Sequence, residues 1–184
     1  MSEQQFLYIA GNWIEAIGAN VAAAGVSIEI QDSTIGKWTR IIGDGIQGIG
    51  NFMIAEANED SLAALGNRIQ GIASEGNAVL AYHELMDDNE EINNQLEIIS
   101  DSLQALGSYI TAVARSDDNP PKAFGNELQA IGAIVEAIGV TNKLKSEEEL
   151  GDQLRNIGKW IQGVGTIIQA LSVTPGVTIF QREK

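Results

Sequence analysis

Few residues in this chain have the types and spacing that catalysis needs. The only histidine, His83, stands beside Tyr82 and Glu84 near the end of a predicted helix, where it could serve as a general acid or base. A lone histidine is more often a surface or packed residue, because acid–base catalysis also needs partners that converge in a pocket. The sequence therefore predicts no catalytic residue, and we expect a protein that is not an enzyme.

Two acidic runs are the remaining candidates for ligand chemistry. Asp87, Asp88, Glu90 and Glu91 could bind Ca²⁺, but they lack the alternating spacing and the central glycine of an EF-hand loop. Both this run and residues 147–149 suit a helix start, where carboxylates face the positive end of the helix dipole. The absence of cysteine and the single histidine argue against zinc and di-iron centres. We therefore expect no metal and no cofactor.

Glycine recurs every seven residues along most of the chain, in units such as GNWIEAI, GNRIQGI and GNELQAI. With the glycine named position e, large aliphatic residues fall at a and d, and small residues at c. This is the spacing of helices that pack along their lengths. The motif "GDGIQGIG", residues 43–50, lies in the same register and lacks the strand and the Lys-Ser/Thr ending of a phosphate loop.

Polar residues concentrate at positions b and f, which are adjacent on a helical wheel. We expect each helix to expose this narrow polar strip and to bury a wide apolar face against two or more neighbours, leaving no polar cavity. A glycine costs about 0.8–1 kcal/mol relative to alanine, so close helix packing must offset the cost. Gly18→Leu should then destabilise the fold, and Asn12→Ala should have little effect.

Caps and helix breakers divide the chain into about six helices in three antiparallel hairpins, within a single domain (1–184) whose tail is 173–184. The predicted N-caps are Ser2, Asp32 or Ser33, Asn58 or Asp60, the run at 87–91, and Ser146 with Glu149. Pro120 and Pro121 suit the first turn of the fifth helix. Gly139 is the predicted end of the fifth helix. Residues 26–30 and 176–180 alternate like strands, so a short β-ribbon is an alternative to a helix extension and a tail.

Three tryptophans occupy the same heptad position, g: Trp13, Trp38 and Trp160. As buried side chains they would fill equivalent gaps, and as exposed ones they would be anchors for a partner. The sequence leaves both interpretations open. They are the only candidate interaction residues that the pattern offers.

Charge and composition limit the partners. The formal net charge of −14 disfavours nucleic acid and anionic membrane surfaces. Residues 160–181 carry no charge, but their Gln, Ser, Thr and Pro content argues against a membrane-spanning helix. The N-terminus lacks the pattern of a signal peptide, so we expect a cytoplasmic protein.

The units "GNELQAIGAIVEAIG" and "GKWIQGVGTIIQAL" resemble small, acidic, repetitive helical proteins from spore-forming bacilli, a group without an assigned activity. The resemblance carries over no functional residue. Repeats without converging polar groups favour a non-enzymatic scaffold or protein-interaction module, including one that self-associates. The alternative is a protein that binds membranes or lipids reversibly, as helical pore-formers do. A ligand carrier or an enzyme would require the cavity that the repeat argues against.

Overall fold

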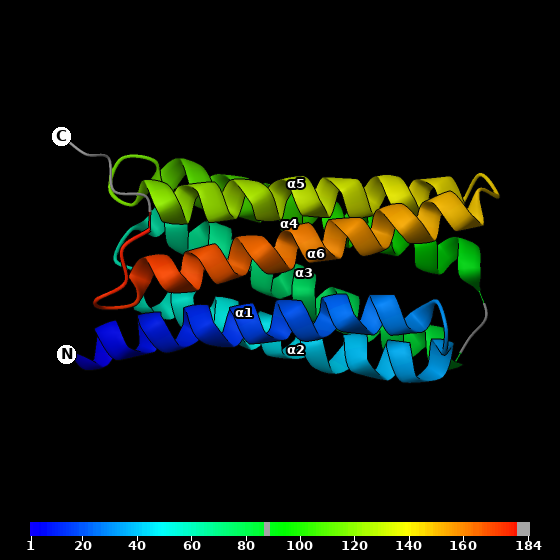
Figure 1. Cartoon of the computed structure of the whole chain (residues 1–184), viewed down its shortest axis with the longest axis horizontal. Coiled ribbons are helices and arrows are strands. Elements are labelled where there is room, and N and C mark those ends of the chain that lie inside the picture. The colour runs from blue at the N-terminus through cyan, green and yellow to red at the C-terminus, as the bar shows by residue number, and fades with distance from the viewer. Residues whose placement is uncertain (87–88, 180–184) are drawn as a thin grey trace.

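The computed structural model describes residues 1–86 and 89–179. Six α-helices occupy this part of the chain: α1 (Glu3–Glu29), α2 (Ser33–Ala57), α3 (Ser61–Met86), α4 (Glu90–Arg115), α5 (Pro120–Lys143) and α6 (Glu148–Val173). No residue in the two described ranges forms a strand. The prediction of an all-α bundle of six helices is therefore confirmed (Figure 1).

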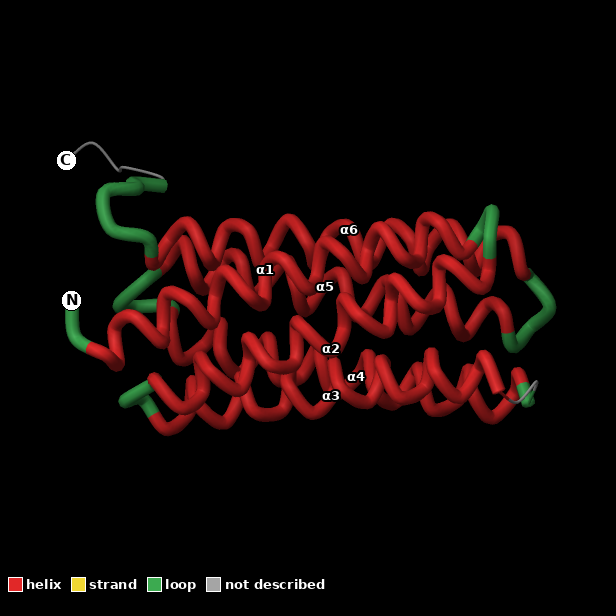
Figure 2. Tube along the Cα trace, turned by 90° about the horizontal axis from the view of Figure 1, so that it is seen from below, coloured by secondary structure: helices red, strands yellow, loops and turns green. Residues whose placement is uncertain are grey.

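The six helices form one closed ring. Each helix packs against the next in the chain, and α6 returns to pack against α1. Neighbouring helices run antiparallel, as short connections predict (Figures 1 and 2). The ends where α1 meets α2 and α5 meets α6 therefore lie together, and we call this end the mouth. The bundle is a barrel whose wall is one helix thick.

Glycine brings paired helices into backbone contact. The facing pairs are Gly11/Gly50, Gly18/Gly43 and Gly25/Gly36 between α1 and α2, Gly66/Gly107 between α3 and α4, and Gly125/Gly165, Gly132/Gly158 and Gly139/Gly151 between α5 and α6. A Cβ added at Gly18 would lie 2.2 Å from the backbone nitrogen of Gln47. The glycines thus lie at the helix–helix contacts, as the heptad predicts. These contacts are within each of the three predicted hairpins.

Most predicted helix starts are observed. Ser2 accepts a hydrogen bond from the backbone N–H of Gln5, and Asp32 accepts one from Ile35. Asp60 caps α3 through the N–H groups of Leu62 and Ala63. Asn89 and Asn119 cap α4 and α5 in the same way, with both prolines in the first turn of α5. These side chains satisfy backbone donors that have no partner inside the helix.

Two predicted helix ends are wrong. Ser146 has a φ of 64°, which is incompatible with the extended backbone of an N-cap, and α6 begins after Glu147, whose side chain makes no capping bond. Gly139 does not end α5, which continues to Lys143. Gly139 instead packs against the backbone of Gly151 and Arg155 in α6. Helix packing, rather than capping, explains this glycine.

The alternative of a β-ribbon is not formed by the described residues. Residues 26–29 are the last turn of α1, and Ile30 has a helical backbone. Val26 faces the interior and is buried. Residues 176–179 are not a strand, and Phe180 lies outside the described residues. The alternating pattern of residues 26–30 is overridden because the chain continues the packing of α1 on α2.

Candidate functional site

The interior of the barrel is polar. Every b residue of the regular repeats is buried: Glu15, Arg40, Gln47, Gln70, Gln104, Gln129, Glu136, Arg155, Gln162 and Gln169. Most f residues join them: Asn12, Asp44, Asn67, Asp101, Asn126 and Lys159. Charged side chains are rarely fully buried unless they are paired, so an interior of this composition is unusual for a helical bundle.

The outer surface is correspondingly apolar. The exposed residues at position d include Ile17, Ile42, Ile49, Leu65, Ile72, Ile99, Leu106, Val113, Ile131, Ile138, Ile157 and Val164. They come from all six helices. Exposed charged side chains lie in the loops or in the first or last turn of a helix, with Arg68 and Glu127 as the exceptions among the described residues. A charge-poor apolar band therefore surrounds the barrel.

This inversion corrects the predicted burial. The heptad correctly groups the residues that share a face, but we assigned the apolar face to the interior because it normally faces a protein core. The structure places the polar face inside. Asn12, expected on the surface, is fully buried and its Oδ1 accepts a hydrogen bond from the Nζ of Lys122. The expectation that Asn12→Ala has little effect therefore loses its basis.

The half of the interior nearer the mouth contains most of the buried charge, and we call it the charged half: Arg40, Asp44, Glu97, Asp101, Glu136, Arg155 and Lys159. Several pairs in it join helices that are not neighbours in the ring. Glu97 on α4 binds Arg40 on α2 at 3.2 Å and Arg155 on α6 at 2.8 Å. Lys159 on α6 lies 3.3 Å from Asp44 on α2. These ion pairs brace the ring across its interior.

Three carboxylates of the charged half lie close together. Glu97, Asp101 and Glu136 each offer an oxygen within 4.8 Å of the others. Burial raises the pKa of Glu97 to about 8, with Glu84 and Glu136 adding to the effect of burial and Arg40 opposing it. Burial and the charge of Glu97 raise the pKa of Asp101 to about 8. The pKa of Glu136 is raised well above its usual range by burial and by Asp101.

The half farther from the mouth is lined mainly by carboxamides, and we call it the amide half: Asn12, Gln47, Asn51, Asn67, Gln70, Gln104, Asn126, Gln129, Gln162 and Gln169. Hydrogen bonds link them into short chains. Gln169 donates to Gln129 at 2.7 Å, and Gln129 donates to Glu15 at 3.0 Å. This chain connects α6, α5 and α1. Burial also raises the pKa of Glu15.

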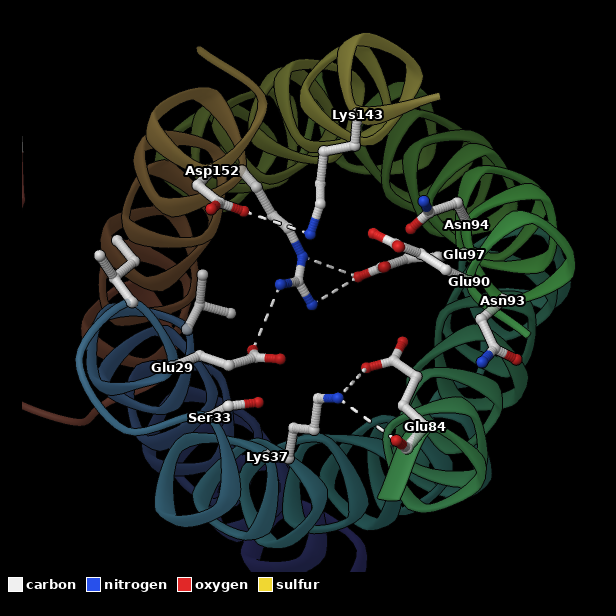
Figure 3. Close-up of a pocket in the computed structure, with 13 residues that line it drawn as sticks. Glu29, Ser33, Lys37, Glu84, Glu90, Asn93, Asn94, Glu97, Lys143 and Asp152 are labelled. Carbon is white, nitrogen blue, oxygen red and sulfur yellow. Dashed lines mark hydrogen bonds and ion pairs between the residues drawn. The ribbon is translucent and has the colours of Figure 1, made fainter. Parts of the chain in front are cut away.

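A polar pocket of about 320 Å³ opens at the mouth. Figure 3 shows Glu29, Lys37, Glu84, Glu97 and Lys143 pointing into it from the surrounding helices. Lys37 lies 3.8 Å from Glu84, and Lys143 lies 3.3 Å from Asp152. The prediction that the bundle contains no cavity with inward polar groups is therefore wrong. The volume falls within the range of small-molecule sites.

All three tryptophans lie on the outer surface, over contacts between hairpins. They are 36% (Trp13), 46% (Trp38) and 43% (Trp160) exposed. Trp13 donates to Thr174, just after α6, and Trp160 donates to Ser27 on α1, so both cover the α1/α6 contact. Trp38 packs edge-on against Tyr82 of α3, with ring centroids 6.2 Å apart. They are partly exposed side chains that also join neighbouring hairpins.

The other sequence candidates do not gather into a site. His83 is exposed on α3, and its Nδ1 lies 3.0 Å from Asn93 Oδ1. Glu90 and Glu91 form the first turn of α4, as expected, whereas Asp87 and Asp88 lie outside the described residues. Residues 43–50 are helical within α2, so they form no phosphate loop. The carboxylates Glu15, Asp44, Asp101 and Glu136 recur at b and f, but the structure buries them inside the barrel instead of exposing them on the predicted polar strip.

Comparisons with known proteins place the chain in a family but do not supply an activity. Among the described residues, no helix is long and apolar enough to cross a membrane. A search of curated proteins and a search of solved structures each found no match. Residues 6–170, nearly the whole helical barrel, match a family of unknown function, DUF6944. The chain therefore belongs to the DUF6944 family.

Proposed function

We propose that this protein is a non-enzymatic helical module that acts by association through its apolar outer surface. The observation that supports the proposal is the inversion of the barrel, with aliphatic side chains outside and polar side chains inside. Exposed apolar surface beyond a few hundred Å² usually marks an interaction site. Self-association or a protein partner would remove this surface from water, and the partly exposed tryptophans would be anchors for such a contact.

A second candidate is association with lipid. A standard interface buries about 800 Å² on each partner, whereas the accessible surface totals 9058 Å² and its apolar band extends over all six helices. Helices that associate within lipid also use small residues for close contact and polar side chains for hydrogen bonds. The glycine contacts and the polar interior have both properties, which is the specific support for this candidate.

The solution mass and vesicle binding of the full-length chain test both candidates. Size-exclusion chromatography with light scattering would measure the mass in buffer, and co-sedimentation with neutral phosphatidylcholine vesicles would measure lipid binding. Self-association predicts a defined oligomer in buffer, and the lipid candidate predicts co-sedimentation. A folded monomer that binds no vesicles would contradict both self-association and the lipid candidate.

Outward substitutions on α2 provide a matched control. Ile42 and Ile49 are 55% and 54% exposed, so Ile42→Gln/Ile49→Gln should weaken association without disturbing the interior. Ile42→Leu/Ile49→Leu keeps the surface apolar and should associate like the wild type. Equal association of the two double variants would show that this part of the surface is not used.

A further inference from the structure

We propose that the charged half binds one calcium ion through the carboxylates of Glu97, Asp101 and Glu136. This inference goes beyond the proposed function, because it concerns the interior rather than the outer surface. The three carboxylates come from α4 and α5, and their oxygens lie within 4.8 Å of one another. An ion equidistant from three oxygens at that upper limit would be about 2.8 Å from each, and slightly closer spacing gives Ca²⁺–oxygen distances of about 2.3–2.6 Å.

Buried oxygens around the three carboxylates have no hydrogen-bond partner. These atoms are Asp101 Oδ2, Asn77 Oδ1 and Gln162 Oε1. An unsatisfied buried oxygen is costly, and several beside one acidic cluster suit a hard cation, which prefers oxygen ligands. The oxygens of Asn77 and Gln162 belong to amides, so they are independent of the spacing of the three carboxylates.

The two amides could complete the coordination shell. Asn77 Nδ2 donates to Asp101 at 3.1 Å, and Gln162 Nε2 donates to Glu136 at 2.7 Å. Each amide thus lies against the cluster with its own oxygen free. A half-turn of either amide would replace this hydrogen bond with an amide oxygen turned toward the cluster. Carboxylate and amide oxygens together would then supply the mixed oxygen ligands typical of Ca²⁺.

The local charge balance agrees with an added cation. When ionised, Asp44, Glu97, Asp101 and Glu136 outnumber the buried cations around them, Arg40, Arg155 and Lys159. Glu29 and Glu84 also pair with these arginines. Lys159 lies 3.3 Å from Asp44 and 3.5 Å from Glu136, so it neutralises one side of the cluster. Asp101 makes no ion pair with a described residue and has only the amide of Asn77 as a hydrogen-bond partner. Asp101 is therefore the ligand on which binding should depend most.

The mouth provides a route for the ion. Glu97 lines both the pocket and the cluster, and it is 5% exposed. Its Oε1 is held by Arg40 and Arg155, which leaves Oε2 for the ion. An ion that enters the pocket would thus meet Glu97 before it reaches Asp101 and Glu136.

Isothermal titration of the full-length chain with CaCl₂, after removal of metal with EDTA, tests the inference. We expect saturable binding of one Ca²⁺ per chain, with weaker binding of Mg²⁺, whose shorter bonds fit the spacing less well. Asp101→Asn preserves the shape of the side chain and should weaken Ca²⁺ binding at least about tenfold. Asp152→Asn removes a carboxylate at the mouth, outside the cluster, and should bind like the wild type.

Refolding each protein in CaCl₂ before measuring its melting temperature separates slow entry from absence of a site. The wild type should melt higher in CaCl₂ than in EDTA, and Asp101→Asn should lose that difference. If the folded wild type shows neither saturable binding nor the increase in melting temperature, the inference is wrong. It is equally wrong if Asp101→Asn binds Ca²⁺ as tightly as the wild type.

Discussion

The charged half and the amide half of the barrel close the same ring with different chemistry. In the amide half, short neutral side chains pass hydrogen bonds from helix to helix, as from Gln169 through Gln129 to Glu15. In the charged half, long side chains reach across to helices that are not neighbours, as Lys159 does to Asp44. Both halves join helices that are not neighbours and contain buried polar atoms without a partner. The charged half differs because three of its carboxylates lie together. The comparison suggests that the amide half is structural and that the charged half can bind a ligand.

The largest loss of stability is expected for a substitution at the α1/α2 contact, which runs along both halves of the barrel. In Gly18→Leu the side chain would start 2.2 Å from the backbone of Gln47, so α1 and α2 must separate. We expect the free energy of unfolding to fall by at least about 3 kcal/mol, measured by urea denaturation followed by circular dichroism. Ile17→Leu, an exposed neighbour, should change it by less than about 0.5 kcal/mol. An unchanged midpoint for Gly18→Leu would show that the close wall is not required.

Removing a cation from the charged half should have the next largest effect. Lys159→Met leaves Asp44 and Glu136 without their buried partner and should cost about 3–5 kcal/mol of unfolding free energy. The double variant Lys159→Met/Asp44→Asn should recover part of the loss, because one unpaired carboxylate is neutralised. If the double variant is no more stable than Lys159→Met in the same denaturation experiment, the pairing is not the cause.

An apolar substitution in the amide half should cost less. Gln129→Leu removes the partner of both Glu15 and Gln169, and we expect a loss of about 1–3 kcal/mol. Gln153→Leu changes an exposed glutamine and should be nearly neutral. A loss for Gln129→Leu as large as that for Lys159→Met would remove the energetic distinction between the two halves.

The charged half should also make the stability of the fold depend on pH. The pKa values of Glu97 and Asp101 are about 8 in the folded chain, above their ordinary values of 4.5 and 3.8, so the folded state binds more protons than the unfolded state between those limits. Stability should therefore decrease as pH rises from 5 to 8. In EDTA, the melting temperature of the wild type should fall by several degrees across this range, and that of Asp101→Asn should fall less. A melting temperature that rises with pH would contradict the assignment.

The sequence was sufficient for the helices and their pairing, because those depend on local and repeating features. Ser2, Asp32 and Asp60 mark helix starts through side-chain hydrogen bonds, and the glycine period identifies the contact shoulder. The direction of the polar face depends instead on how the ring closes. The heptad separates a polar face from an apolar face but does not say which of them points into the bundle. The placement of Asn12 on the surface therefore did not follow from the pattern alone.

The candidate cation site was beyond local reasoning for a related reason. Glu97 and Asp101 are one helical turn apart on α4, but Glu136 comes from a separate helix. Their proximity follows from the register of α4 against α5, which neither caps nor glycines specify. The sequence pattern gave the polar residues at b and f, and only the closed ring showed that they share one interior.

The glycine contacts of the wall also have a consequence for how the sequence of this family can vary. At Gly18, Gly43 or Gly50 even one methyl group would overlap the backbone of the facing helix. The outward aliphatic positions, by contrast, touch nothing on one side and can exchange isoleucine for leucine or valine freely. We expect divergent members of the family to keep the glycines and the buried amides while their outer residues drift. Mutational scanning of the barrel should reproduce the same division between tolerant and intolerant positions.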